Sequence, residues 1–265
     1  MCYDISYRIT LESIEDYFGD IDTDIQLDMD FSVSIHVLAH AYKKHPVVIF
    51  EDGKYKLKAF EWGVIANYMD TPEKVKKMRN SMCNARSEKI LDDKKSFWHR
   101  IRHKRCLIPV NGIFEHREIK GWKNKVPYYV QLKGRDVFCI PGLYTYPPRP
   151  SNIETGEVNG TFTLITREAN SIMKQIHNAG DQAFRMPHFL PKDLELKWLD
   201  PNLSDEGIRE IFGFEMPSEE LDYRPVFTIR STKPRPDDKT KVDAFDWPNL
   251  PPLGQDDGEL QKALF

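Results

Sequence analysis

The chain lacks the features that mark membrane-spanning, disulfide-linked and zinc-binding proteins. Its longest apolar runs, such as residues 46–50 and 162–165, are much shorter than a membrane span, and residues 1–15 lack the basic and then apolar pattern of a signal peptide. Its 4 cysteines form no CxxC pair and no finger-like spacing with the 8 histidines. A glycine-rich phosphate loop is also missing. We therefore expect a cytoplasmic protein with no membrane association, no metal and no cofactor.

An excess of positive charge is missing as well. The sequence has 38 Lys and Arg residues against 41 Asp and Glu residues, a net charge of -3, whereas nucleic-acid-binding proteins usually carry a basic balance or a concentrated basic face. Residues 94–105 depart from this average, because basic side chains cluster there around Phe97 and Trp98. This stretch fits a phosphate-binding surface and a solvated helix face equally well. Its basic residues are Lys94, Lys95, His99, Arg100, Arg102, His103, Lys104 and Arg105.

What the chain does contain is enough apolar material for a core. Hydrophobic residues make up 40% of the sequence and charged residues 30%, which predicts a folded core beneath a charged surface. No Gly/Ser linker separates two halves, so we expect one domain over residues 1–232. Prolines interrupt any regular structure in residues 233–265, and we expect an extended or partly disordered tail there.

Local patterns predict an α+β fold that is rich in strands. Residues 46–60 are typical of a hairpin that turns at Asp52-Gly53, because this dipeptide readily adopts positive φ angles. Thr71-Pro72 is typical of the start of a helix, which we expect to end near Asn80. Further strands are predicted over residues 106–114, 126–132, 137–140, 161–165 and 224–229, and further helices over residues 169–176, 194–199 and 204–212. Since there is no βαβ rhythm, the elements predict a single β-rich domain of mixed strands with short peripheral helices.

Cys2 is the most unusual candidate for chemistry. Methionine aminopeptidases generally remove Met1 when the second side chain is small, so the mature chain would begin with a 1,2-aminothiol. A free α-amine has a pKa of about 7.7 to 8.0 and a thiol has a pKa of about 8.5, so both nucleophiles are available near neutral pH. An aldehyde can condense with the amine to an imine, which the sulfur closes into a thiazolidine. The alternative is a cysteine without a role at a frayed terminus.

Four polar residues farther along the chain are candidates that each have an ordinary structural alternative. Asn84 could cap a helix, and Arg86 could form a surface ion pair. Glu115 could be a carboxylate at a strand end, and His177 could be a helix-end residue favoured by the helix dipole. Considered one at a time, none of the four distinguishes a functional role from a structural one.

An ordered set of motifs nevertheless runs through residues 2–230. It consists of Met1-Cys2, Trp62-Gly63, Asn84-Ala85-Arg86, Arg105-Cys106-Leu107-Ile108-Pro109, Gly112-Ile113-Phe114-Glu115, Thr166, Ile176-His177 and Arg185-Met186-Pro187. In this order the motifs resemble the SOS response-associated peptidase (SRAP) family, also called the abasic-site-processing family. The resemblance implies a β-rich SRAP-type fold in which the mature N-terminal cysteine meets asparagine, glutamate and histidine at a DNA-binding cleft.

Carried over residue by residue, the resemblance implies a catalytic set of four residues. Cys2 is the implied nucleophile and crosslinking residue, and Asn84 is the implied hydrogen-bond partner of its α-amine. Glu115 is implied as the acid and base for sugar-ring opening and thiol attack, and His177 as an aid to proton transfer around the Schiff base. The implied DNA-binding residues are Arg86 at a phosphate, Thr166 in the pocket wall, Trp62 or Trp98 as a stacking ring, Arg105 and Arg185.

Three positions depart from the common pattern of the family. Tyr3 stands where many members have glycine, and His116 replaces a tryptophan that often follows the glutamate. Residues 178–184 lengthen the turn between the histidine motif and the Arg-Met-Pro motif. The first departure affects the fit around the terminus and the third affects the path of the DNA, but every implied catalytic group is present.

Together these inferences predict a sensor that crosslinks to abasic sites in single-stranded DNA and shields them. An abasic deoxyribose opens to an aldehyde, and the missing base lowers the cost of exposing that carbon. We expect a monomer that is nucleoid-associated if the source is bacterial, and the resemblance implies replication-fork proteins as further partners. Two alternatives stay open: a cysteine autopeptidase, or a protein that binds single strands without catalysis. Because only Met1 precedes Cys2 here, we do not expect self-processing to be needed.

Overall fold

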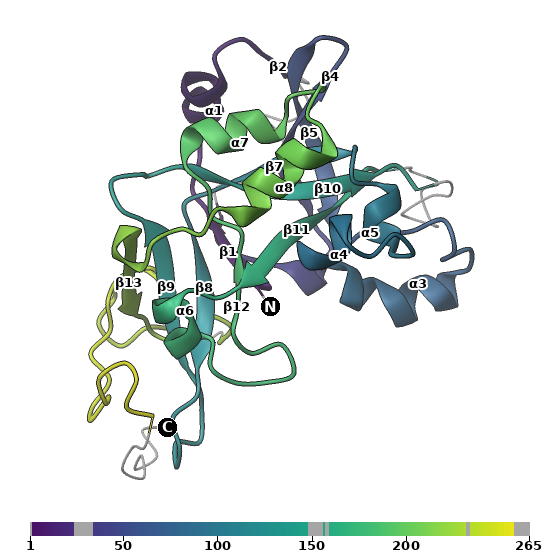
Figure 1. Cartoon of the computed structure of the whole chain (residues 1–265). Coiled ribbons are helices and arrows are strands. Elements are labelled where there is room, and N and C mark those ends of the chain that lie inside the picture. The colour runs from purple at the N-terminus through teal and green to yellow at the C-terminus, as the bar shows by residue number, and fades with distance from the viewer. Residues whose placement is uncertain (1, 24–33, 148–155, 157–158, 232–233, 257–265) are drawn as a thin grey trace.

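Two β-sheets with short helices around them form the framework of the molecule (Figure 1). The computed structural model describes residues 2–23, 34–147, 156, 159–231 and 234–256. The predicted fold class, a β-rich α+β domain with peripheral helices, is confirmed. Within the described residues, no helix is long and apolar enough to cross a bilayer.

The smaller sheet contains the N-terminal strand. Its order is β13 (Leu221–Pro225), β9 (Val126–Leu132), β8 (Gly112–Arg117), β1 (Asp4–Tyr7) and β3 (Ser34–Leu38). β1 runs antiparallel to β8, with Ile5 opposite Ile113. This pairing places the first described residues of the chain beside the strand that contains Glu115.

The larger sheet carries the remaining strands. Its order is β12 (Arg185–Pro187), β11 (Thr161–Glu168), β10 (Phe138–Thr145), β7 (Arg105–Val110), β4 (Lys44–Glu51), β5 (Lys54–Trp62) and β2 (Ile21–Thr23), and β6 (Asn84–Arg86) pairs with β11. β4 and β5 form the predicted hairpin, in which Asp52 and Gly53 have φ angles of 53° and 80°. β6 runs parallel to β11, so Asn84 lies opposite Leu164.

The prediction of a single strand over residues 106–114 is wrong. The chain turns at Asn111, so β7 belongs to the larger sheet and β8 to the smaller one. At the first residue of β8 the backbone passes very close to an aromatic ring, since a Cβ on Gly112 would lie 2.5 Å from Cζ of Tyr129. The predicted strand over residues 224–229 is also displaced, because β13 ends at Pro225 and Val226 leaves the ladder after donating to the Pro127 carbonyl.

Short helices lie around the sheets. They are α1 (Leu11–Phe18), η1 (Ala39–Ala41), α3 (Pro72–Met78), η2 (Arg79–Met82), α4 (Glu88–Leu91), α5 (Phe97–Arg100), α6 (Ser171–Ile176), α7 (Lys192–Trp198), α8 (Asp205–Gly213) and η3 (Ser218–Glu220). Thr71 caps α3 as predicted, and its hydroxyl accepts a hydrogen bond from the Lys74 backbone. Asn170 caps α6 in the same way, which fixes the start of the short helix whose C-cap is His177.

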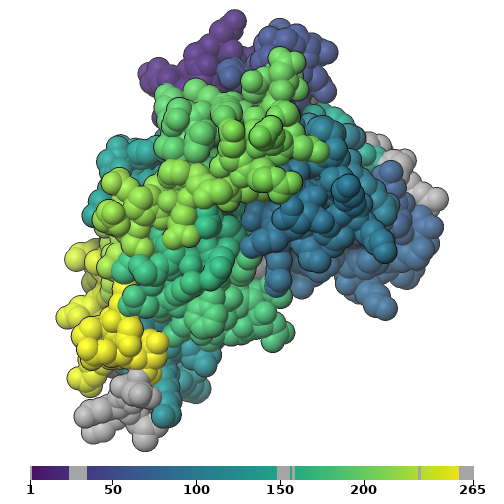
Figure 2. Space-filling model, viewed as in Figure 1, coloured from purple at the N-terminus to yellow at the C-terminus, as the bar shows by residue number. Residues whose placement is uncertain are grey.

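Residues 234–256, which we call the C-terminal segment, contain no helix and no strand, but they pack against the body of the protein. An isolated bridge joins Val226 to Ala244, and Trp247 is buried with its indole N–H donating to the Val226 carbonyl. Figure 2 shows this segment in yellow along the lower left of the molecule. Residues 257–265 of the predicted tail lie outside the described residues.

Candidate active site

Cys2 lies two residues before the start of β1 at Asp4 and is completely buried. Its thiol donates a long hydrogen bond, 3.6 Å, to the backbone carbonyl of Asp4. Burial raises the pKa of the Cys2 thiol well above its ordinary value, and the nearby charge of Glu115 raises this pKa further. The sulfur is therefore held as a protonated thiol.

Asn84 connects Cys2 to the larger sheet. Its side-chain nitrogen donates to the Cys2 carbonyl over 2.9 Å, and the residue is only 4% exposed. Because Asn84 begins β6 and Cys2 leads into β1, this bond joins the two sheets. The Oδ1 atom of Asn84 is buried and has no hydrogen-bond partner among the described residues. A buried amide oxygen in this position can accept a hydrogen bond from an amine.

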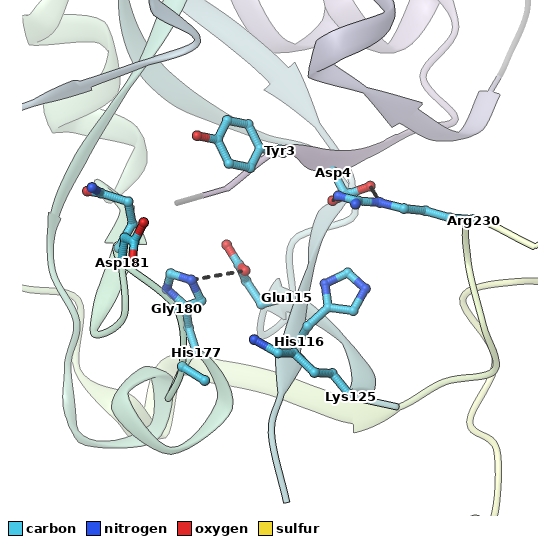
Figure 3. A pocket seen from close by; sticks show the side chains of 11 residues that line it. Tyr3, Asp4, Glu115, His116, Lys125, His177, Gly180, Asp181 and Arg230 are labelled. Atoms are coloured by element: carbon cyan, nitrogen blue, oxygen red, sulfur yellow. Dashed lines mark hydrogen bonds and ion pairs between the residues drawn. The ribbon is translucent and has the colours of Figure 1, made fainter. Parts of the chain in front are cut away.

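Glu115 and His177 form a buried pair. Nε2 of His177 lies 3.9 Å from Oε2 of Glu115 (Figure 3). Nδ1 of His177 is 2.8 Å from the Arg185 carbonyl, and because a carbonyl only accepts, Nδ1 carries the proton of that bond and Nε2 faces the carboxyl group. Burial raises the pKa of the Glu115 carboxyl, which the neighbouring His177 partly offsets. A carboxyl group with a raised pKa can act as a proton donor closer to neutral pH.

The pair opens onto a pocket of about 370 Å³. Tyr3 and Asp4 line this pocket, whereas Cys2, which precedes them in the chain, is not among the lining residues. The turn after His177, which the sequence analysis singled out as long, forms one side (Figure 3). The lining residues are Tyr3, Asp4, Glu115, His116, Lys125, His177, Ala179, Gly180, Asp181, Gln182 and Arg230.

Asp4 is a site residue that the sequence analysis missed. Its carboxylate is 2% exposed and accepts hydrogen bonds from Nε2 of His36 at 2.6 Å and from Nε of Arg230 at 3.0 Å. Burial works against ionisation, but these hydrogen bonds outweigh it and lower the pKa of Asp4. The only signal in the sequence is an acidic residue in an otherwise buried strand, because Arg230 is 226 positions away.

Two of the expected DNA-binding arginines lie near the pocket. Arg86 is exposed at the end of β6 and donates to the side-chain oxygen of Gln182, a pocket residue. Arg185 instead forms a two-pronged ion pair with Glu88, at 2.7 and 2.9 Å, and also donates to the Thr166 carbonyl over 2.8 Å. Arg86 is therefore better placed for an external ligand than Arg185.

The other residues expected to bind DNA lie inside the protein or away from the pocket. Trp62 is 1% exposed and donates to the Cys83 carbonyl, and Thr166 is fully buried. Arg105 is 7% exposed, and its guanidinium donates to the carbonyls of Trp198 and Asp200. None of residues 94–105 lines the pocket, and Trp98 is half-buried. The buried side chains of Trp62, Thr166 and Arg105 are thus part of the protein interior and do not line the pocket.

Comparison with known proteins extends across most of the chain. The model of a family described as SOS response associated peptidase (SRAP) matches residues 1–229. The chain is 32% identical over 160 residues to abasic site processing protein YoqW of Bacillus subtilis, a match that covers 60% of this chain and 64% of that relative. It is also 32% identical over 208 residues to abasic site processing protein YoaM of the same organism, with coverage of 77% and 83%. The chain thus spans slightly less than two thirds of YoqW.

A solved structure shows the same fold. The crystal structure of a protein from Bacteroides thetaiotaomicron superposes with a TM-score of 0.73 and is 28% identical in sequence. The superposition covers 91% of this chain and 97% of that protein. The fold is therefore shared over nearly the whole length of both chains.

Proposed function

The chain belongs to the SOS response associated peptidase family, and on this premise we propose that it recognises abasic sites in single-stranded DNA and captures them covalently through Cys2. The relatives that are named abasic site processing proteins supply the substrate class. The observation that carries the proposal is that Asn84 holds the backbone of Cys2 next to the pocket that contains the Glu115–His177 pair.

The reaction begins with a free α-amine on Cys2, which removal of Met1 exposes. This amine condenses with the C1′ aldehyde of the opened sugar, and a water molecule leaves as the imine forms. The thiol then adds to the imine carbon and its proton passes to the nitrogen, which closes the thiazolidine. Because burial holds the sulfur as a thiol, the amine is the first nucleophile and the sulfur is the second.

The surrounding side chains support each step. The unpartnered Oδ1 of Asn84 is available to accept a hydrogen bond from the α-amine. Glu115, whose pKa is raised, donates a proton to the sugar-ring oxygen as the ring opens, and the resulting carboxylate later relays the thiol proton to the nitrogen. His177, whose Nε2 faces Glu115, assists this proton transfer.

A cysteine peptidase or autopeptidase is the second candidate, because Cys2, His177 and Glu115 are types of residue that catalyse acyl transfer. Cysteine peptidases work through a thiolate, which requires a lowered thiol pKa. Here the pKa of Cys2 is raised instead. A thiol with a raised pKa is more in keeping with capture of an aldehyde than with attack on a peptide bond, and a lyase-like strand cleavage would follow from the same imine.

An adduct assay tests the proposal. The purified protein is mixed with a single-stranded oligonucleotide that carries one abasic site, and with the intact oligonucleotide as the control. We expect a denaturation-resistant adduct on the abasic strand only, with mass spectrometry locating the bond on residue 2. Peptide cleavage without an adduct would identify a peptidase, and reversible binding alone would identify a non-catalytic single-strand binder.

Arg86→Ala is expected to weaken reversible binding about tenfold, because a charge-assisted hydrogen bond to a phosphate contributes on the order of 1.5 kcal/mol. The loss is the same for intact and abasic strands, since a phosphate contact carries no base identity. Fluorescence anisotropy across a salt series measures it, and the log-log salt slope becomes shallower by about 0.7. Arg102, which is paired with Asp205 at 2.8 Å, provides the control. A loss of affinity confined to abasic DNA would instead assign Arg86 a role in the chemical step.

A further inference from the structure

The end of the C-terminal segment lies outside the part of the chain that matches the family, yet it contacts the strand that carries Glu115. The family match ends at residue 229. Residues 247–256, which we call the brace, lie against the ends of β8 and α6. Trp247 anchors the start of the brace through its hydrogen bond to the Val226 carbonyl and its stacking on Phe227.

Arg117 fastens the brace to β8. It ends the strand two residues after Glu115, and its side chain is fully buried. Four of its hydrogen bonds go to the brace: to the carbonyls of residues 251, 252 and 255 at 2.8, 2.7 and 3.1 Å, and to Oδ1 of Asp256 at 2.8 Å. A fifth goes to the Tyr128 hydroxyl at 3.3 Å. A buried guanidinium is stable only where its donors are satisfied in this way, so the side chain and the brace depend on each other.

The same end of β8 is joined to the residue that follows His177. The backbone N–H of Glu118 donates to Oδ1 of Asn178 over 2.8 Å, and Nδ2 of Asn178 donates to the Glu118 carbonyl over 2.9 Å. Next to this pair, the backbone N–H of Lys120 donates to the Asp256 carbonyl over 2.7 Å. Residues 117–120 therefore join the brace on one side to the His177 turn on the other.

The brace also approaches α6 directly. Gly254 has a φ angle of 83°, and a Cβ at this position would lie 3.1 Å from the side-chain oxygen of Gln175. Gln175 lies in α6, two residues before His177. Both elements that present the Glu115–His177 pair are thus in contact with the brace.

We propose that the brace sets the separation of Glu115 and His177, with Arg117 and Asn178 as positioning residues. The expected effect on adduct formation rests on the proposed function, whereas the expected effect on the position of Glu115 and His177 does not. The two side chains are 3.9 Å apart, too far for a direct hydrogen bond, so their relative position depends on the elements that hold them. When the brace is released, water reaches the Glu115 carboxyl and its pKa falls toward the ordinary value.

The test uses three variants of the full chain. Arg117→Ala removes the attachment of the brace, and Asn178→Ala breaks the joint at the His177 turn from a half-buried position that the core does not require. Arg235→Ala is the matched control, because Arg235 is 9% exposed and donates to carbonyls of residues 240, 243 and 244 in the same C-terminal segment, without a bond to β8. Asn178→Asp keeps the oxygen that accepts from Glu118 and is expected to restore part of the function.

Two measurements are made on each variant. Carbon-13 NMR of labelled glutamate follows the titration of Glu115, and single-turnover kinetics follow adduct formation at saturating abasic DNA. We expect a lower pKa of Glu115 and a 10-fold to roughly 100-fold slower adduct rate in the Arg117 and Asn178 variants, with unchanged Kd. The Arg235 variant keeps the native pKa of Glu115 and the native adduct rate, although its melting temperature falls.

Other results overturn the proposal in distinct ways. If the pKa of Glu115 is native in the Asn178 and Arg117 variants, the brace does not position the pair. If the Arg235 variant loses rate in parallel with its melting temperature, as the other two do, the brace acts only on general stability. A native protein that forms no adduct would refute the proposed function, while the NMR titration would still decide whether the brace positions Glu115.

Discussion

A protein in which the residue before Cys2 cannot be removed is expected to form no adduct with abasic DNA. The peptide bond would convert the α-amine into an amide, whose lone pair is delocalised and cannot condense with an aldehyde. Binding to the strand persists, because the phosphate contact expected of Arg86, which donates to the side chain of Gln182 at the pocket, does not use the α-amine. Gel analysis of the native and the extended proteins on one abasic oligonucleotide measures the difference, with intact mass confirming the first residue.

Cys2→Ser is the companion to this experiment. It keeps the amine but replaces the sulfur with a much poorer nucleophile for ring closure. The expected product is an imine that borohydride traps and that otherwise dissociates, instead of a stable thiazolidine. Crosslinking by an extended protein that retains its extension, at the native rate, would mean that the α-amine of Cys2 plays no part.

Glu115→Gln is expected to slow adduct formation about 10²-fold, since general acid catalysis by one group commonly contributes 10²-fold or more. The pH dependence identifies the role. Because the pKa of Glu115 is raised, the acid form persists toward neutral pH, and the native rate falls as the pH rises through that raised pKa. The variant lacks this falling limb, and its rate only rises as the α-amine loses its proton. Stopped reactions between pH 5 and 8 measure both profiles, and parallel profiles would exclude a proton-donor role.

Stability provides the control for this variant. A carboxyl group whose folded pKa is raised favours folding only while it is protonated, so its contribution is lost as the pH rises through the folded pKa. Glu115→Gln is therefore at least as stable as the native protein above that pH, and the difference between them disappears in acid. Thermal melting of both proteins at pH 5 and pH 8 measures this difference in stability. A variant that is both slow and less stable at pH 8 would instead point to a folding defect.

The elements that were predictable from sequence are those with local signals. The β4–β5 hairpin follows from Asp52-Gly53, and α3 follows from the cap at Thr71. The change of sheet at Asn111 was not predictable, because the residues on either side are equally suited to a strand. Beside this change of sheet, the backbone of Gly112 passes close to the ring of Tyr129, a tertiary contact that the local sequence does not reveal.

At the candidate site, too, local motifs were predictable from the sequence and tertiary contacts were not. The ordered motifs identified Cys2, Asn84, Glu115 and His177, and the structure places Asn84 against Cys2 and His177 beside Glu115. The motifs could not distinguish a residue that faces the pocket from one that holds its wall, so Trp62 and Arg105 were expected at the DNA but lie inside. Asp4 and Arg117 went unnoticed because Arg230, which binds Asp4, and residues 251–256, which bind Arg117, are more than 100 positions away from them in the sequence.

The complete burial of Cys2 also bears on oxidation. Peroxides and alkylating agents react with exposed thiolates, and the raised pKa of Cys2 keeps the thiolate fraction low. An exposed, acidic cysteine at a chain terminus would soon become a sulfenic acid or a mixed disulfide with a small thiol. In this fold the sulfur is shielded from such reagents. In the proposed reaction, an aldehyde that has condensed with the α-amine holds its electrophilic carbon next to the sulfur. Burial that slows the reaction of the thiol with free reagents would thus leave the thiol intact for the proposed capture.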